Sequence, residues 1–328
     1  FTSLLKEAQR TRSLRWWVLA PGALRALPLL GLRLEGGELL AEQVQRLSHL
    51  PSLGFGLLGG RLQQQGEPFT VCLLAPESHQ GTTCFGEAAL ETLRGVYPPD
   101  LVVEPAKLQG QGGDVMEPLR SRAARIQTLR LYGIGRPESL NDTTGCLRLG
   151  PGHSLMERNT LDLVLPRCRV VELWASTAGS ADLERVIRDH ADRLPGLVPG
   201  FLASGAVAVI DLAWPVHDVV KALVCEQYGW RSRRTGHGPE ILAESIEHVA
   251  LALRELPGLP DSSTPREVLA ALDELRTLQA EQVLGRPTAL ARFEAQADSL
   301  LLAGLSGAEL IDELCQPVHL GAFRWWGE

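Results

Sequence analysis

The chain has 328 residues, which is enough for one large domain or two of ordinary size. Apolar residues make up 45% of it and charged residues 22%, a balance that is typical of a soluble globular protein and excludes a disordered or fibrous one. A net charge of −7 gives the chain no general attraction for phosphates, so we expect no direct nucleic-acid partner.

The cysteines and the hydropathy of the chain bear on its compartment. The six cysteines show no C-x-x-C pair and no other zinc spacing, so we expect reduced thiols and no metal. No run of 18 apolar residues and no secretory leader is present, so we expect a cytoplasmic protein that does not contact a membrane. Because the first residue is Phe1 rather than Met, we also expect a piece of a longer protein, which is either cut, trimmed or without an upstream domain.

Short apolar runs bounded by Gly, Pro or polar residues predict buried strands. In chain order they are residues 14–20, 69–74, 101–104, 128–132, 169–175 and 206–213. Stretches with helical spacing lie between them, as at 39–47 and 183–189. Continuous apolar strands that alternate with amphipathic helices predict an α/β domain, in which helices cover both faces of a mostly parallel sheet.

The C-terminal third of the chain changes character. From residue 239 to about 302 the pattern is helical, with Pro257 and Pro260 ending a first helix and residues 262–267 forming a cap with Pro at the start of a second. Residues 322–326 predict a last strand that returns to the sheet. No internal repeat and no linker longer than residues 109–113 is present, so we expect a single domain.

Two tryptophan pairs, Trp16-Trp17 and Trp325-Trp326, lie near the two ends of the chain. Neighbouring residues of a strand point to opposite faces of the sheet, so we expect each pair to place one indole in each layer of the core. An exposed indole from these pairs would instead favour a protein contact, because Trp is frequent among interface hot spots.

Four stretches, in this order, carry a family resemblance: VLAPGALRALP at residues 18–28, residues 40–53 with their PSL ending, FLASGA to AWPVHD at residues 201–218, and AFRWWG at residues 322–327. They resemble the strand and PDGAL turn, the helix and PSL turn, the FLAAGA…WPVDD segment and the closing strand of the CHAT family. These are caspase-like domains that bacteria commonly join to helical-repeat or nucleotide-sensing modules. The resemblance implies a caspase-like three-layer sandwich.

The resemblance also implies how one CHAT-like domain over residues 1–328 would be organised. An N-terminal pseudo-half would span residues 1–125. The remnant of the catalytic core would follow over residues 126–238, and a helical segment with the final strand over residues 239–328.

The family places a catalytic His at the end of one central strand and a catalytic Cys at the end of the next. Here RLYGIG at residues 130–135 matches the first run and keeps Gly135, but Ile134 stands at the imidazole position. LWASTAG at residues 173–179 matches the second run, with Ser176 as the nucleophile. An aliphatic side chain handles no proton, and a serine hydroxyl needs a positioned base, so we expect no catalysis.

One histidine offers an alternative base for Ser176. His217 follows the strand that ends near Trp214, and it replaces the first Asp of the family's WPVDD. The simpler interpretation of His217 is a helix-start residue with a solvated ring. His237 lies in a basic loop between helices, and His153 lies in a turn. The other histidines, which are His49, His79, His190, His248 and His319, have no companion at metal-ligand spacing, so we expect no metal site.

Asp218 keeps the second acid of the same motif, where related peptidases build a pocket for a substrate side chain. With Trp214 it would form the remnant of that pocket. A first-turn Asp also stabilises a helix through the N-terminal dipole by about 0.3–1 kcal/mol, which is reason enough for its presence.

The sequence contains no convincing nucleotide-binding motif. The glycines of residues 54–60 resemble a G-x-G-x-x-G fingerprint, but a Pro51-Ser52 turn precedes them and no acid follows about twenty residues later. No G-x-x-x-x-G-K-[ST] run occurs, so we expect no cofactor.

These observations predict a pseudo-peptidase that acts as a scaffold, regulator or partner of another protein in a bacterial defence or signalling assembly. Its partner would be a sensor module or an active peptidase. A working hydrolase that uses Ser176 with a divergent base is the alternative, and Ser176 is also what an engineered replacement of Cys would leave. A dimerisation or ligand-sensing module that makes no use of a peptide cleft is a third possibility.

Overall fold

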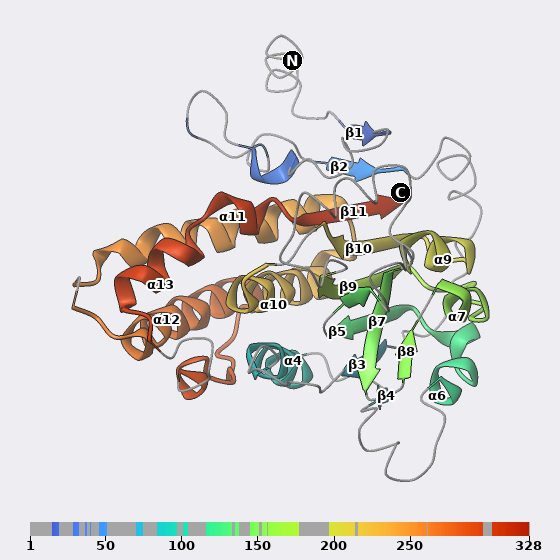
Figure 1. The fold of residues 1–328 in the computed structure, drawn as a ribbon, viewed down its shortest axis with the longest axis horizontal. Coiled ribbons are helices and arrows are strands. Elements are labelled where there is room, and N and C mark those ends of the chain that lie inside the picture. Colours follow the sequence, from blue (N-terminus) through green and yellow to red (C-terminus); the bar gives the residue numbers. More distant parts are fainter. Residues whose placement is uncertain are drawn as a thin grey trace.

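The computed structural model describes residues 15–19, 29–32, 37, 40, 46–50, 70–74, 84–96, 101–103, 116–132, 135–137, 145–150, 153–155, 157–176, 197–213, 216–260, 262–297 and 304–327. Within them, eight strands form one sheet in the order β1-β2-β11-β10-β9-β5-β3-β4 (Figure 1). The bounds are β1 Arg15–Val18, β2 Arg46–His49, β3 Thr70–Leu74, β4 Leu101–Val103, β5 Thr128–Tyr132, β9 Val170–Ser176, β10 Ala208–Leu212 and β11 Phe323–Gly327.

The sheet consists of two blocks of parallel strands. Strands β10, β9, β5, β3 and β4 run in one direction. Strand β11 is antiparallel to β10, and β2 and β1 run parallel to β11. The chain therefore forms a mostly parallel mixed sheet, as the continuous apolar strands predict.

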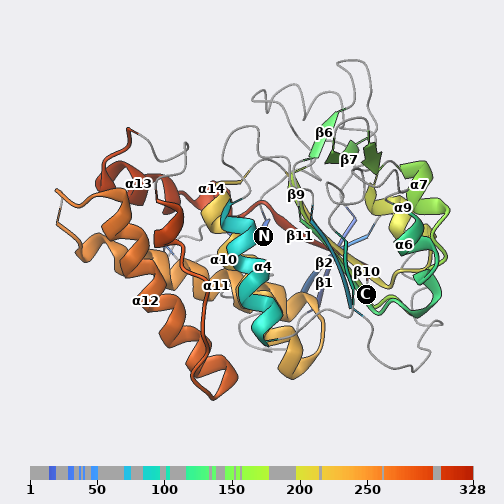
Figure 2. The ribbon, with the colours of Figure 1, turned by 90° about the horizontal axis from the view of Figure 1, so that it is seen from below.

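Helices cover both faces of this sheet, so the molecule is an α/β three-layer structure (Figure 2). The first face carries α4 Cys84–Val96, α10 Asp218–Thr235 and α11 Pro239–Glu255, with α12 Pro265–Leu284 and α13 Gly307–Leu314 beyond them and the short α14 Pro317–Leu320 next to the start of α10. The second face carries α6 Glu117–Arg120, α7 Glu157–Leu161 and α9 Leu197–Ala203. A small antiparallel sheet comprises β6 Gly135–Pro137, β7 Gly145–Gly150 and β8 His153–Leu155.

The alternation of side chains along the strands divides the core into two layers. In β9, Val171 and Leu173 join the apolar cluster beneath α6, α7 and α9, while Trp174 joins the cluster beneath α4, α10 and α11. The closing strand behaves in the same way, because Trp325 and Trp326 lie in different clusters and are 2% and 1% exposed. The prediction for this pair is confirmed, and it follows from the two-residue period of a strand.

The other tryptophan pair differs, because β1 lies at the edge of the sheet. Trp16 packs against the apolar cluster beneath α4, α10 and α11, whereas Trp17 is 46% exposed. Trp17 is therefore the exposed indole that the sequence analysis associates with a contact to another protein, and this contact stays a prediction.

The helical expectation over residues 39–47 is wrong at its end, where the chain forms β2. Leu47, Ser48 and His49 are buried. Strand β2 pairs with β1 on one side and with β11 on the other. This segment forms a strand because its backbone groups bond to two neighbours and its side chains fill the core, a tertiary effect that overrides local spacing. The helical stretch at residues 183–189 and the loop at residues 109–113 lie outside the described residues.

The break between the first two C-terminal helices and the start of α12 lie where the sequence predicts. The helical pattern expected to about residue 302 is wrong beyond Leu284, because Gly285 in the left-handed conformation ends α12 and residues 285–297 contain only a 3-10 turn over Glu294–Gln296. Helix α11 ends at Glu255, and a 3-10 turn over Leu256–Gly258 follows it. Helix α12 begins with Thr264 as N-cap and Pro265 in the first turn. In its capping box the Glu267 backbone N–H donates to the Thr264 hydroxyl, and the Thr264 backbone N–H donates to the Glu267 carboxylate. In the described part of the chain, no helix has both the length and the apolar character that crossing a membrane demands.

Candidate functional site

The carboxyl ends of the central strands form the natural place for a site in this sheet. The chain passes from β3 outward to β4, but from β5 it passes the other way to β9 and β10. Ligands of open α/β sheets bind outside the carboxyl ends of the strands where this direction changes, which here is between β3 and β5. Tyr132 is the last residue of β5 and pairs with Leu74 of β3 and Trp174 of β9.

The structure places only some of the residues that the sequence singles out. Ser176 is the last residue of β9 and pairs with Leu212 of β10, so it lies at the carboxyl edge. Gly135 begins β6 and pairs with Leu147. Ile134, Trp214 and the Ser176 side chain lie outside the described residues.

Asp218 forms a buried cluster at this edge with two residues that the sequence analysis does not single out. Its Oδ1 lies 2.6 Å from Lys221 Nζ and accepts a hydrogen bond of 3.3 Å from the Tyr132 hydroxyl. Lys221 Nζ also lies 4.7 Å from the centre of the Tyr132 ring. Asp218 is the first residue of α10, as expected, but its carboxylate also joins the helix to the end of β5.

One carboxylate oxygen of the cluster has no hydrogen-bond donor within the described part of the chain. Asp218 Oδ2 is buried and has no hydrogen-bond partner among the described residues. A buried carboxylate oxygen without a partner costs free energy, because it has lost its water and gained nothing in exchange. Asp218, Lys221 and Tyr132 are all under 10% exposed, so bulk water does not compensate this oxygen, which keeps its capacity to accept a hydrogen bond.

A close approach of α4 fixes the position of Tyr132. A Cβ at Gly86 would lie 1.8 Å from the Tyr132 ring, so this position in α4 accepts only glycine unless the ring moves. The ring is therefore held between α4 on one side and Asp218 and Lys221 of α10 on the other.

His217 caps α10 instead of facing solvent. Its ring Nδ1 accepts a bond of 3.3 Å from the backbone N–H of Val219, and the backbone N–H of His217 donates to His319 Nδ1 at 3.3 Å. His319 Nε2 lies 3.0 Å from Glu313 Oε1. Burial, and then the neighbouring His319, lower the pKa of His217 to about 4. The expected helix-start role is confirmed, but the expected solvated ring is wrong.

This arrangement makes His217 a weak candidate for a base. A general base works best with a pKa near the operating pH, and the Nδ1 lone pair of His217 is already used by the helix. The neutral ring then carries its proton on Nε2, which is a donor rather than an acceptor.

His237 lies at the opposite edge of the sheet. Its Nε2 is 3.2 Å from the hydroxyl of Thr128, the first residue of β5, and its Nδ1 is 2.9 Å from the Tyr228 hydroxyl. Strands β5 and β9 are parallel, so Thr128 and Ser176 stand at different ends of them. Burial lowers the pKa of His237 to about 4. It is a structural residue between α10 and α11, and the strand length separates it from Ser176.

Sequence reasoning missed Tyr132 and Lys221, although both leave a signal. Tyr132 is the last residue of the strand predicted over residues 128–132, and it is followed by Gly133 in the RLYGIG run. Lys221 follows Asp218 by three residues, a spacing that places two side chains on the same helix face. No group of acidic, cysteine and histidine side chains suited to a metal ion occurs in the described part of the chain.

Comparison with known proteins adds no assignment. No family model matches the chain, and no curated protein matches it.

Proposed function

We propose that this chain is a non-catalytic, caspase-like domain of the CHAT type that acts as a scaffold, regulator or partner of another protein in a bacterial defence or signalling assembly. The observation that carries the proposal is the state of His217. The one histidine that follows the carboxyl edge and precedes α10 uses its Nδ1 as a helix cap and is neutral with a pKa of about 4.

The positions of the two matched runs support the family part of the proposal. In the CHAT family the catalytic pair stands at the ends of adjacent strands. Here Ser176 ends β9, Ile134 follows the end of β5 by two residues, and β5 and β9 are neighbours in the sheet. The Ile134 side chain carries no proton, and the Ser176 hydroxyl without a base is a poor nucleophile.

The edge keeps features that suit binding without chemistry. The order in which successive strands are added reverses between β3 and β5, next to Tyr132, and the unpartnered Oδ2 of Asp218 can accept a hydrogen bond from an N–H donor. An extended segment of a partner protein offers such donors along its backbone and in its side chains. Recognition of this kind uses no nucleophile, so it survives loss of the catalytic pair.

The catalytic part of the proposal is tested with a proteome-derived peptide mixture and mass spectrometry of new N-termini. We expect the wild-type chain and Ser176→Ala to give the same result as buffer. Cleavage by the wild-type chain that Ser176→Ala abolishes would show that Ser176 works as a nucleophile, and the non-catalytic assignment would then be wrong.

The family part is tested by rebuilding the catalytic pair. Iodoacetamide labelling of the peptide that contains position 176 is compared between Ser176→Cys and the double variant Ile134→His/Ser176→Cys at pH 6. An adjacent imidazole lowers a thiol pKa, so we expect labelling at least about tenfold faster in the double variant. Equal rates would mean that positions 134 and 176 do not face one another, and the CHAT match would fail.

The binding part is tested with a randomised library of extended peptides. We expect the wild-type chain to enrich a subset of peptides and Asp218→Asn to lose this enrichment. Asp312→Asn, an exposed change on α13, is the matched control and should enrich the same peptides as the wild type. Equal enrichment by Asp218→Asn would remove the carboxyl edge as the binding surface.

A further inference from the structure

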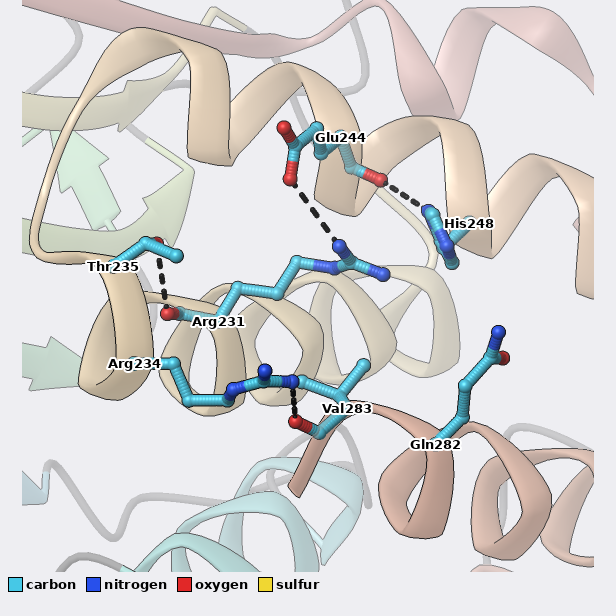
Figure 3. A pocket seen from close by; sticks show the side chains of 7 residues that line it. All are labelled: Arg231, Arg234, Thr235, Glu244, His248, Gln282 and Val283. Carbon is cyan, nitrogen blue, oxygen red and sulfur yellow. Dashed lines mark hydrogen bonds and ion pairs between the residues drawn. The ribbon is translucent and has the colours of Figure 1, made fainter. Parts of the chain in front are cut away.

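A polar cavity lies on the helical side of the molecule, away from the carboxyl edge. It has a volume of about 280 Å³ and lies between the last turn of α10, the first half of α11 and the last turn of α12. Figure 3 shows the side chains of Arg231, Arg234, Glu244, His248 and Gln282 around it. The volume is near the lower end of the range for ligand pockets, so the cavity suits a small molecule and not a peptide.

The arginines of the cavity carry more positive charge than the wall neutralises. Arg231 Nη1 lies 3.2 Å from Glu244 Oε2. Arg234 donates from Nη1 to the Val283 carbonyl, which is a neutral group at the end of α12. Two guanidiniums and one carboxylate leave a formal charge of +1 in the lining.

One edge of the Arg231 guanidinium carries a nitrogen without a hydrogen-bond partner in the described part of the chain. Its Nε is buried and has no partner among the described residues, while Nη1 is engaged by Glu244. Nε and Nη2 form the side of a guanidinium that binds the two oxygens of a carboxylate in parallel. Burial lowers the pKa of Arg231, which is consistent with a cation whose compensation is incomplete.

The opposite part of the lining offers hydrogen-bond groups of both kinds. His248 Nδ1 lies 2.8 Å from the Glu244 carbonyl, to which it donates, so Nε2 is the ring nitrogen that is left for a ligand. In Figure 3 the His248 ring and the Gln282 amide lie on the same side of the cavity. These groups suit hydroxyl or amide groups on the rest of a ligand.

From this lining we infer that the cavity is a binding site for a small monocarboxylate that carries further hydroxyl or amide groups. The carboxylate binds the Nε/Nη2 edge of Arg231, and the polar remainder faces His248 and Gln282. A phosphate dianion fits less well, because the formal charge of the lining is +1 and the Glu244 carboxylate forms part of the wall. The site is independent of the function proposed for the carboxyl edge.

Binding is measured by calorimetry and by the shift in melting temperature with lactate, gluconate and N-acetylglycine, at constant ionic strength set with sodium chloride. We expect at least one of these probes to bind the wild-type chain and glucose, the neutral counterpart of gluconate, not to bind. Arg231→Gln should weaken binding by roughly tenfold or more, because charge-assisted bidentate bonds are lost.

Arg233→Gln is the matched control, since Arg233 lies in the same turn but is exposed and outside the cavity lining. We expect its affinity to stay within about twofold of the wild type. Circular dichroism establishes that each variant folds. If Arg231→Gln does not fold, Gln282→Trp replaces it, since an indole on the exposed end of α12 fills the cavity and should abolish binding.

Three results would overturn the inference. The first is that none of the three carboxylates binds. The second is that Arg231→Gln and Arg233→Gln weaken binding equally, which would show general charge attraction. The third is that inorganic phosphate binds more tightly than every carboxylate.

Discussion

Among the described residues, buried charged groups in the middle of helix α10 have complete sets of partners, whereas those at its two ends do not. In the middle, Glu226 binds Arg276 of α12 through both oxygens, at 2.8 Å from Nε and 2.5 Å from Nη2. Arg276 also donates to Asp273, and its guanidinium stacks on the Phe293 ring at 3.6 Å from the ring centre. Asp273 in turn accepts from the backbone N–H groups of Phe293 and Glu294.

At the ends of the same helix, polar atoms stay open. Among the charged groups of α10, Asp218 Oδ2 in the first turn and Arg231 Nε near the C-terminal end have no partner among the described residues. The uncharged Gln227 Oε1 and Trp230 Nε1 between them also have none, whereas the charged atoms of Glu226, Arg276 and Asp273 are not among the unpartnered atoms. A closed ion cluster joins two helices and needs nothing more. An open one is incompletely compensated, so a group bound at either end of α10 would satisfy an atom that the described part of the fold leaves without a partner.

The largest effect is expected from breaking the closed cluster. Replacement Arg276→Met leaves Glu226 and Asp273 buried without their cation, which typically costs about 3–5 kcal/mol. The free energy of unfolding from urea titration measures it. Arg286→Ala, at an exposed position after α12, is the control and should change stability by less than about 0.5 kcal/mol. A loss below about 1 kcal/mol for Arg276→Met would show that the cluster is not a structural centre.

A smaller effect is expected at the open cluster. Replacement Asp218→Asn removes the charge that compensates Lys221, and we expect a loss of about 2 kcal/mol in the free energy of unfolding. The loss is smaller than at Arg276 because the Lys221 side chain is 10% exposed and its ammonium can turn toward water. If Asp218→Asn and Arg276→Met cost the same, the distinction between the open and closed clusters would be lost.

A pH dependence of similar size is expected just beyond the end of α10. The pKa of His237 is lowered from 6.5 to about 4, so the unfolded state takes up a proton before the folded state does. Stability is therefore complete above pH 6.5 and falls as the pH decreases from 6.5 toward 4. From pH 7 to pH 5 the expected loss from this residue is about 2 kcal/mol.

Urea titrations at the two pH values measure this loss. His237→Gln cannot titrate and keeps a polar side chain near Thr128 and Tyr228, so its stability should fall less between pH 7 and pH 5 than that of the wild type. Equal losses in both proteins would show that the ring is already solvated in the folded state.

Much of the sheet is predictable from the sequence, because its strands carry their own signal. The run at residues 128–132 is a strand with the predicted bounds, and the other five predicted apolar runs overlap β1, β3, β4, β9 and β10. Strand β2 is the exception, since its pattern resembles a helix and only its two neighbours make it a strand. The CHAT resemblance, the single domain and the pseudo-peptidase role stay predictions.

The site is less predictable, because it depends on contacts between residues far apart in the chain. The sequence places His217 at a helix start, but its lowered pKa comes from burial and from His319. Asp218 reads as a first-turn acid, yet its hydroxyl donor Tyr132 is 86 residues away. His237 resembles a surface-loop residue, and only its bond to Thr128 places it at the amino edge of β5.

Local patterns of the sequence are enough to predict the α/β alternation, the strands of the large sheet other than β2, and the cap of α12, since burial period, turn residues and capping boxes act over a few neighbouring residues. The tertiary structure decided which polar groups meet, at which edge of the sheet each histidine lies, and which atoms on α10 stay open. Those outcomes depend on the order of the strands and on helix packing, which bring together groups that no local pattern relates.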